Sequence, residues 1–324
     1  MASSQPHVVL NTGAKMPAIG LGCWGGRLGG LTEEENEAVL PWITSALKIG
    51  YRHFDTALDY GTEYAIGKAL KESGIPRKEV FVTTKLPVYH HRMVDASIER
   101  SLKNSGFEYF DLWLMHWPQA MANMDGKPYP HYPGPNGEPD QGHFIMDDDR
   151  SFNQTWADME KVLETGKVRA IGVSNFSVKN LKKLLETANV IPAVNQVEMH
   201  PHQAQPELLE FCRRERVVLT AYSPTGHSEV ANDPAIVQLA KKFNLSPAQI
   251  SLAWHLARGT SAVPQSTNEA RQRANILELP TLSDEEVDLI NNLHKNARYC
   301  WYPDPTERNG EKLVFGWTYD QLGW

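Results

Sequence analysis

The fold is decided by a stretch that begins with YRHFD at Tyr51–Asp55 and continues through VFVTTKL at Val80–Leu86 to YFDLWLMH at Tyr109–His116. These runs are rich in β-branched and aromatic residues and apolar on both faces, which is typical of strands buried in a parallel sheet. Five further runs of this kind occur along the chain: Ala18–Leu21, Val168–Ser174, Val194–Met199, Val217–Tyr222 and Ser261–Pro264. We therefore predict eight buried strands.

The segments between these strands carry the signals of amphipathic helices. Four of them begin with a polar capping residue and a partner that is typical of a helix start: Thr32 with Glu35, Asp233 with Pro234, Ser246 with Gln249, and Ser283 with Glu286. Pro41 lies inside the first of these segments, where we expect a kink or a new first turn because proline lacks the amide hydrogen. Strands that alternate with helices in this way indicate right-handed βαβ units.

Two architectures contain eight parallel strands joined by helices: a closed (β/α)8 barrel, the TIM barrel, and an open doubly wound sheet. An open dinucleotide-binding sheet would carry GxGxxG between its first strand and a helix. The nearest string, GLGCWG at 20–25, has that spacing but is followed by GRLGG at 26–30 instead of a helix. We therefore interpret it as a loop and predict the barrel.

Length alone leaves the number of domains open. At about 150 residues per domain, 324 residues suggest two, whereas a barrel of about 250 residues or more forms one. The hydrophobic share of 41% and the charged share of 22% are ordinary for a globular protein and exclude a disordered or collagen-like chain. With the order of strands and helices, we predict one (β/α)8 barrel domain over residues 1–324.

Charge and cysteine content exclude several classes of function. The formal net charge is -7, from 32 basic and 39 acidic residues, which argues against a nucleic-acid-binding protein. The three cysteines suit a reducing compartment and show no metal-ligand spacing. The start, MASSQPHVVL, does not resemble a secretory signal, and no apolar run reaches the roughly 18 residues of a membrane span. We expect a cytoplasmic protein without a metal ion or a membrane partner.

Two segments fall outside the alternation of strands and helices. Residues 118–143 contain six prolines and four glycines, and so long a connection in a compact domain is usually functional or mobile. Residues 297–324 contain too many aromatic side chains for a solvated tail, so we expect this segment to pack on the barrel. Its halves could divide between a pocket wall (Tyr299–Tyr302) and plain packing (Phe315–Trp324), and this point stays open.

Residues that act in such a barrel lie at the C-terminal ends of its strands. Four titratable residues lie there or in the loop that follows: Asp55, Tyr60, Lys85 and His116. A lysine near the tyrosine lowers the tyrosine pKa, an aspartate keeps that lysine charged, and a histidine can donate to an oxyanion. The tyrosine is then a general acid able to protonate a carbonyl oxygen. Because no thiol or serine base system is visible, a hydride cofactor is the natural source of the electron pair.

Longer motifs surround these residues. They are GYRHFDTALDYGTE at Gly50–Glu63, GKVRAIGVSNF at Gly166–Phe176, HWP at His116–Pro118, NQVEMHP at Asn195–Pro201 and AYSP at Ala221–Pro224. The first two resemble the two signatures of the aldo-keto reductases, and the others match the same family in the same order. The resemblance covers about residues 8–300. Several long motifs in one order make it highly specific.

The resemblance implies a (β/α)8 barrel that is closed at the bottom by an N-terminal hairpin at about residues 8–16. It implies the NADPH-dependent reduction of aldehydes and ketones. By motif position, Tyr60 would be the proton donor, Lys85 and Asp55 would tune it, and His116 would orient the carbonyl group.

The resemblance also implies a cofactor site and a substrate pocket. Tyr222 would stack on the nicotinamide, and Ser174, Asn175 and Gln196 would hold its carboxamide. The other residues that would bind the cofactor are Ser223, Pro224, Gln265, Ser266, Thr267, Asn268, Arg271 and Asn275. The residues that would wall the substrate pocket are Trp24, Trp117, Cys300 and Trp301.

The site expected for the 2′-phosphate of the cofactor departs from the family pattern. The family usually has Pro-Lys-Ser there and an arginine six residues after the lysine, whereas this chain reads Pro264-Gln265-Ser266 and keeps Arg271. Glutamine can donate a hydrogen bond but brings no charge. Ala274 stands where an acidic residue near the adenine is usual. We expect NADPH to be preferred through Arg271, less strongly than in relatives with the lysine, with NADH as the second choice.

Two other interpretations stay open. Some barrels of this family bind a nicotinamide cofactor in a regulatory or structural role, although the complete set of four titratable residues argues against this here. Double-bond reduction goes with glutamate at the position of His116, so the histidine favours carbonyls. The carbonyl substrate, small or sugar-type, depends on the folds of residues 118–143 and 297–324. By likeness to the family we expect a monomer or a weak dimer.

Overall fold

The computed structural model describes residues 6–26, 29, 31–123, 129, 131–133, 139–300, 306–308 and 310–324. At its centre is an eight-stranded parallel sheet in which successive strands are neighbours. In sheet order the strands are β3 (Leu21–Gly22), β4 (His53–Asp55), β5 (Phe81–Leu86), β6 (Leu112–Met115), β9 (Ile171–Ser174), β10 (Val194–Glu198), β11 (Val218–Tyr222) and β12 (Ser261–Ala262). All eight predicted strands are present, and each is shorter than predicted.

The first and last strands meet and close the sheet into a barrel. Ile19 pairs with Ala262 in a parallel bridge, and the amide of Ala262 donates to the carbonyl of Ala18 at 2.8 Å. On the same seam, the amide of Gly22 donates to the carbonyl of Pro264 at 3.0 Å. The predicted (β/α)8 barrel is therefore confirmed. The open doubly wound sheet is excluded, because its edge strands would remain unpaired.

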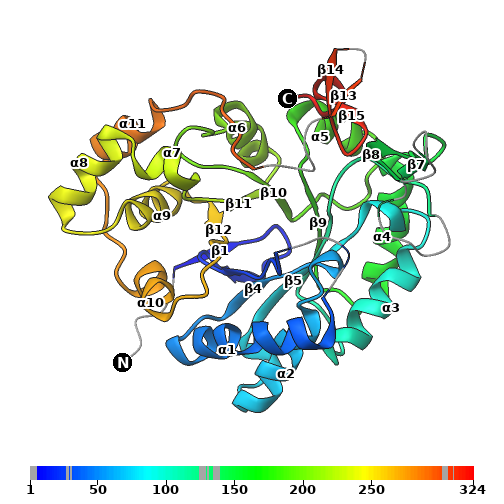
Figure 1. Cartoon of the computed structure of the whole chain (residues 1–324), viewed down its shortest axis with the longest axis horizontal. Coiled ribbons are helices and arrows are strands. Elements are labelled where there is room, and N and C mark those ends of the chain that lie inside the picture. The colour runs from blue at the N-terminus through cyan, green and yellow to red at the C-terminus, as the bar shows by residue number, and fades with distance from the viewer. Residues whose placement is uncertain are drawn as a thin grey trace.

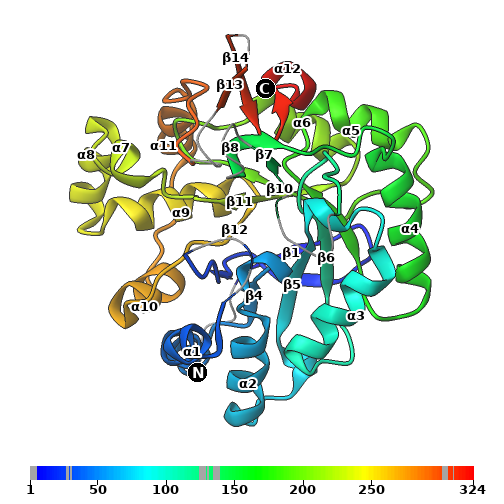
Figure 2. The same cartoon turned by 45° about the vertical axis from the view of Figure 1, so that its right-hand side comes forward.

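Helices surround the barrel strands in both views (Figures 1 and 2). They are α1 (Glu33–Ile49), α2 (Glu63–Ser73), α3 (Val94–Ser105), α4 (Phe152–Glu164), α5 (Val178–Leu185), α6 (Pro206–Arg214), α7 (His227–Ala231), α8 (Pro234–Phe243), α9 (Pro247–Ala257), α10 (Glu269–Leu277), α11 (Asp284–Asn291) and α12 (Tyr319–Leu322). Short 3₁₀ helices are η1 (Leu58–Tyr60), η2 (Arg77–Glu79) and η3 (Val88–His90).

The predicted helix starts are confirmed. Thr32, Ser246 and Ser283 each form a capping box, and the side chain of Asp233 accepts a hydrogen bond from the amide of Ala235. Pro41 does not begin a new helix, because α1 runs across it without a break. Its ring lies on the exposed side of α1, where the hydrogen bond it cannot donate leaves a carbonyl near solvent.

An N-terminal hairpin covers the bottom of the barrel, as predicted. Strands β1 (His7–Val9) and β2 (Lys15–Pro17) pair antiparallel. Leu10 and Met16 are buried and pack in one cluster with Phe81 and Leu112, which lie at the starts of β5 and β6. The active-site end of the barrel is therefore the opposite one.

The two irregular segments form small sheets over that opposite end. The connection after β6 holds the hairpin of β7 (His131–Pro133) and β8 (Pro139–Phe144), and the tail holds β13 (Thr306–Arg308), β14 (Glu311–Val314) and β15 (Trp317–Thr318). The two lie side by side in Figures 1 and 2. Phe144 and Phe315 are buried in one cluster with Trp117, which follows β6. The Phe315–Trp324 half of the tail thus covers a residue expected in the substrate pocket.

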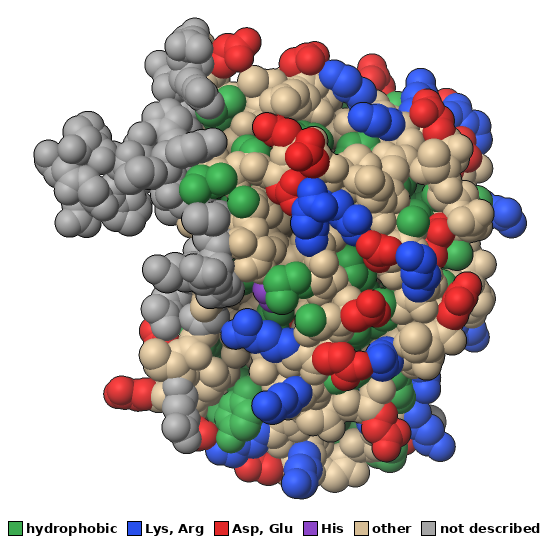
Figure 3. Space-filling view, turned by 90° about the vertical axis from the view of Figure 1, so that its right-hand side faces the viewer, with side chains coloured by type: hydrophobic (Ala, Val, Ile, Leu, Met, Phe, Trp, Pro, Cys, Tyr) green, Lys and Arg blue, Asp and Glu red, His purple; other side chains and the backbone are tan. Residues whose placement is uncertain are grey.

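Within the described residues, no helix is long and apolar enough to cross a bilayer. Figure 3 shows one face of the molecule, on which acidic and basic side chains are interspersed.

The barrel seam leads to a first prediction. A Cβ atom at Gly22 would lie 2.6 Å from the carbonyl oxygen of Val263, a backbone atom that cannot move without opening the seam. We expect Gly22→Ala to lower the free energy of unfolding in urea by about 1–3 kcal/mol through overpacking. Glu72→Ala, on the exposed side of α2, is the control and should stay within about 0.5 kcal/mol of the parent protein. Equal stability of the two variants would contradict this description of the seam.

Candidate active site

Strands β4 and β5 place a buried ion pair at the active-site end of the barrel. The ammonium of Lys85 lies 2.6 Å from Oδ1 of Asp55 and also donates to the carbonyl of Thr56 at 2.8 Å. Both charged residues are buried. From across the barrel, the side-chain amide of Gln196 on β10 donates to Oδ2 of Asp55 at 2.7 Å. Both carboxylate oxygens are therefore satisfied, as a buried charge requires.

Tyr60 ends the short helix η1, directly after β4. Its hydroxyl lies 3.4 Å from Nε2 of His116, which follows β6, and the ammonium of Lys85 lies 4.8 Å from the centre of its ring. Trp24 packs edge-on against the same ring, with the ring centres 5.0 Å apart. The barrel thus brings together the four titratable residues that the sequence analysis selected.

The protonation of these groups differs in one respect from the prediction. Burial raises the pKa of Tyr60 well above its ordinary value, and the carboxylates of Asp55 and Asp59 add to this. The predicted lowering by Lys85 is therefore wrong for the chain alone, because Asp55 neutralises the lysine charge and the hydroxyl is desolvated. Burial also lowers the pKa of His116 well below 6.5. The site holds a protonated phenol beside a neutral imidazole.

Sequence reasoning missed the residue next to this tyrosine. Asp59 is buried, its Oδ1 accepts from the hydroxyl of Tyr89, and its Oδ2 accepts from the hydroxyl of Tyr129 at 2.7 Å. The same Oδ2 lies 3.9 Å from Nδ1 of His116. Burial raises the pKa of Asp59 to about 6. A second acidic residue in the motif at Gly50–Glu63 was the available signal, but its partners come from η3 and the connection after β6.

The residues expected to hold the nicotinamide also lie together. Ser174 ends β9 and Asn175 follows it, Gln196 lies on β10, and Tyr222 ends β11 and is partly exposed. The hydroxyl of Tyr222 donates to Oδ1 of Asn175 at 2.8 Å, and the amide of Asn175 donates to the carbonyl of His116 at 3.0 Å. The hydroxyl of Ser174 donates to the carbonyl of Gln196. A carboxamide that binds here would therefore have to replace some of these internal hydrogen bonds with its own.

The residues expected along the rest of the cofactor lie after β11, after β12 and on α10. Ser223 is half-buried with a positive φ of 48°, and the carbonyl of Pro224 accepts from His255 at 3.2 Å. Thr267 is exposed in the loop before α10, where the hydroxyl of Ser266 donates to the carbonyl of Asn268. Asn275 is buried on α10.

The start of α10 carries the expected phosphate site. The side chain of Asn268 caps the helix by accepting from the amide of Arg271, whose own side chain is exposed. The guanidinium of Arg271 forms no ion pair with any residue in the described ranges. Gln265 donates to the carbonyl of Trp24 at 2.6 Å, so it links this loop to the wall of the active site.

The four residues expected in the substrate pocket have different surroundings in the structure. Trp24 packs on Tyr60, as described above. Trp117 is buried, with its ring centre 5.2 Å from that of Phe315 and 5.8 Å from that of Trp324. The sulfur of Cys300 lies 2.8 Å from the hydroxyl of Ser223, and burial raises the pKa of its thiol to about 12, so it is no nucleophile at neutral pH. Trp301 lies outside the described residues.

These residues fit a nicotinamide dinucleotide in their chemistry. The partly exposed Tyr222 suits stacking, the side-chain amides of Asn175 and Gln196 suit a carboxamide, and the exposed cation of Arg271 at a helix N-terminus suits a phosphate. Among the described residues, no three His, Cys, Asp or Glu side chains gather as a metal site.

Comparison with known proteins decides the family. The model of the Aldo/keto reductase family matches residues 18–295. This chain belongs to the aldo-keto reductases. It is therefore an oxidoreductase of the kind that acts on carbonyl compounds with a nicotinamide cofactor, and the resemblance of its motifs is confirmed.

Named aldo-keto reductases match this chain over most of its length. It is 41% identical to a glycerol 2-dehydrogenase (NADP(+)) of Saccharomyces cerevisiae, over 88% of this chain and 90% of that protein. It is 38% identical to an aldehyde reductase of the same yeast, over 91% and 93% of the two chains. It is also 38% identical to aldo-keto reductase family 1 member A1 of Homo sapiens, over 90% of each chain.

The position of Asp59 predicts a pH-dependent stability. Its pKa rises from an ordinary 3.8 to about 6 on folding, so between these values the folded state holds a proton that the unfolded state has lost. The contribution of this carboxyl group to the free energy of unfolding is therefore most favourable below pH 3.8, and it becomes less favourable as the pH rises through about 6. We expect Asp59→Asn to gain up to about 3 kcal/mol relative to the parent between pH 4 and pH 7, measured by urea unfolding.

Asp148→Asn, at an exposed aspartate, is the matched control and should show no such trend. A difference between Asp59→Asn and the parent that stays constant with pH would show that Asp59 is not buried as described.

Proposed function

We propose that this aldo-keto reductase reduces aldehydes and ketones to alcohols with Tyr60 as the general acid and NADPH as the preferred donor. One observation carries the proposal: the Lys85–Asp55 pair lies buried beneath the ring of Tyr60, whose hydroxyl faces His116. A purely structural barrel would have no need of a buried lysine, because burying a charge costs free energy even when it is paired.

The residues divide the work between proton transfer and orientation. When bound, the nicotinamide supplies a hydride to the carbonyl carbon. Tyr60 is protonated at neutral pH because burial raises its pKa, so its hydroxyl can give a proton to the carbonyl oxygen. His116 is neutral and can direct an N–H toward the same oxygen. Lys85 stabilises the phenolate that remains, and Asp55 holds Lys85 in place.

The non-catalytic alternative has no observation in its favour. The four residues that the reaction needs are all present and close together, and the relatives named above are a dehydrogenase, an aldehyde reductase and a family 1 reductase. His116 favours carbonyl reduction over double-bond reduction, because glutamate is expected for the latter.

NADPH is the proposed cofactor because Arg271 offers an exposed cation beside the first turn of α10. The relative named for NADP(+) supports this choice. Gln265 brings no charge and is engaged with the carbonyl of Trp24, so we propose a weaker preference over NADH than a lysine would give.

The substrate and the setting are proposed in general terms. We expect small or sugar-type aldehydes to bind beside Tyr60 and Trp24, near the tail and the connection after β6 that cover Trp117. We further infer one domain over residues 1–324 and a cytoplasmic monomer or weak dimer without nucleic-acid or membrane partners.

Tyr60→Phe tests the assignment of the general acid. The variant keeps the ring and its packing but has no proton to give, so kcat for aldehyde reduction should fall by about 10²- to 10⁴-fold. The rate is followed by the loss of NADPH absorbance, and NADPH affinity is measured on the same samples and should survive. Tyr64→Phe, at an exposed tyrosine on α2, is the control and should keep full activity. Retained activity in Tyr60→Phe would refute the assignment.

Cofactor preference can be measured as the ratio of kcat/KM with NADPH to that with NADH. We expect Arg271→Gln to lower this ratio by about tenfold or more, because a charged hydrogen bond to the 2′-phosphate is lost. Gln265→Lys should raise it, since it restores a cation. Arg273→Gln removes another exposed arginine of α10 and should leave the ratio unchanged. A parent ratio near one would show that the preference itself is absent.

A further inference from the structure

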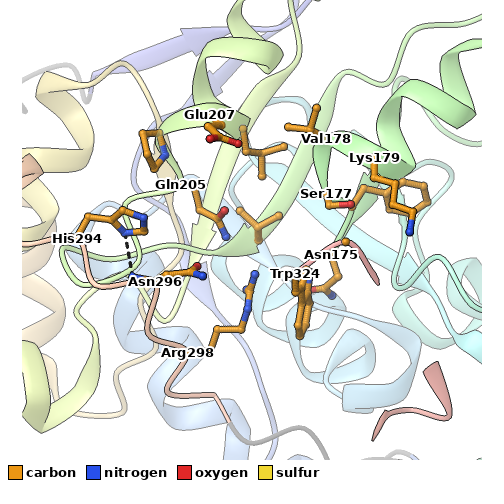
Figure 4. Close-up of a pocket in the computed structure, with 15 residues that line it drawn as sticks. Asn175, Ser177, Val178, Lys179, Gln205, Glu207, His294, Asn296, Arg298 and Trp324 are labelled. Atoms are coloured by element: carbon orange, nitrogen blue, oxygen red, sulfur yellow. Dashed lines mark hydrogen bonds between the residues drawn. The ribbon is translucent and has the colours of Figure 1, made fainter. Parts of the chain in front are cut away.

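A cavity of about 360 Å³ lies beside the active site, between the N-terminal ends of α5 and α6 and the chain that follows α11 (Figure 4). Its lining is mixed, and the polar part includes Ser177, Gln205, His294, Asn296 and Arg298. Asn175 stands at the boundary with the nicotinamide site, and Trp324 forms a wall. The volume falls within the range of about 300–1,000 Å³ that is typical of small-molecule sites.

Arg298 is the lining residue best suited to bind a ligand in this cavity. It is half-buried, and its guanidinium extends into the space enclosed by the lining residues (Figure 4). One face of it stacks on the ring of Trp324 at 3.8 Å from the ring centre. It forms no hydrogen bond or ion pair with any residue that the structure describes. Its N–H donors therefore have no partner within the described residues and can face a ligand in the cavity, while burial lowers the pKa of this group.

The neighbouring charged groups form no ion pair with this cation in the described part of the chain. Lys179 is already paired with Asp320 at 3.2 Å. The negative charge of Glu198 raises the pKa of Arg298 and so offsets part of its charge, but Oε1 of Glu198 accepts from the amides of Tyr299 and Cys300 and not from Arg298. Glu207 also lines the cavity, but it is exposed, so solvent screens it.

The remaining lining groups are suited to donate hydrogen bonds. Nδ1 of His294 accepts from the amides of Ala204 and Asn296, which places the proton of the neutral ring on Nε2. Within the described part of the chain, no side chain caps the first turn of α6, where Gln205 is the N-cap residue. The amides of that turn add partial positive charge at the same cavity.

We propose that this cavity binds a small anion, with Arg298 as its principal ligand through a bidentate contact to carboxylate or phosphate oxygens. A planar guanidinium matches both groups in geometry. The site is distinct from the expected 2′-phosphate site, since Arg271 lies on α10, which follows β12 and packs against α1 and α9, whereas α5 and α6 follow β9 and β10. It is separate from the residues proposed for proton transfer, because none of Asp55, Tyr60, Lys85 and His116 lines it, and it shares Asn175 with the expected nicotinamide site.

Calorimetric titration of the full chain tests this proposal. Inorganic phosphate and malonate are titrated separately into protein saturated with NADP(+), which occupies the expected site at Arg271. We expect one binding event for at least one of the two probes, and their relative affinities distinguish a phosphate from a carboxylate ligand. Arg298→Gln should weaken binding by about tenfold or more, because the charged hydrogen bonds are lost.

Two further variants make the result decisive. Arg298→Lys keeps the positive charge but loses the paired N–H donors of the guanidinium. It should therefore bind the anion more weakly than the parent but more tightly than Arg298→Gln. Arg216→Gln removes an exposed arginine after α6, at the other end of the barrel, and should bind like the parent. Absence of binding to the parent protein, or parent-like binding by both Arg298→Gln and Arg298→Lys, would overturn the proposal. Because the readout is binding and not turnover, it is separate from the test of Tyr60.

Discussion

The buried ion pair between Lys85 and Asp55 is the interaction on which the active site depends. Their side chains are 0% and 4% exposed, and burying each charge without a partner would cost on the order of several kcal/mol. The pair is tolerable only because Thr56 and Gln196 complete its hydrogen bonds. These groups come from β4, β5 and β10, so the barrel must be closed and in register for the pair to exist.

The same pair explains the state of Tyr60. Lysine near a tyrosine normally favours the phenolate, but here Asp55 neutralises the lysine and burial dominates, so the phenol keeps its proton. That is the state a proton donor needs before the reaction. The lysine charge then becomes important when the proton has left, since it stands 4.8 Å from the ring that carries the negative charge.

Much of this could be predicted from local sequence patterns. The eight strands and the four helix starts follow from hydrophobic runs and capping residues, and the four titratable residues follow from their places after strands. The raised pKa of Tyr60 could not be predicted from the sequence, because it depends on burial by groups that are far apart in the chain. Asp59 was missed for the same reason, since Tyr89 and Tyr129 reach it from other segments. The covering of Trp117 by Phe315 likewise depends on tertiary packing between two irregular segments.

The match to the family ends at residue 295, and Arg298 and the tail that covers the site lie beyond it. The four residues of the proposed reaction lie within the matched range, and we propose that the tail, which covers Trp117, contributes to substrate choice. The central claim, that the buried pair makes Tyr60 a working acid, is tested most directly by kcat for NADPH-dependent aldehyde reduction in Asp55→Asn. This change preserves shape and removes the charge that holds Lys85. We predict a fall of about 10²-fold or more with NADPH affinity retained; an unchanged kcat would contradict the claim.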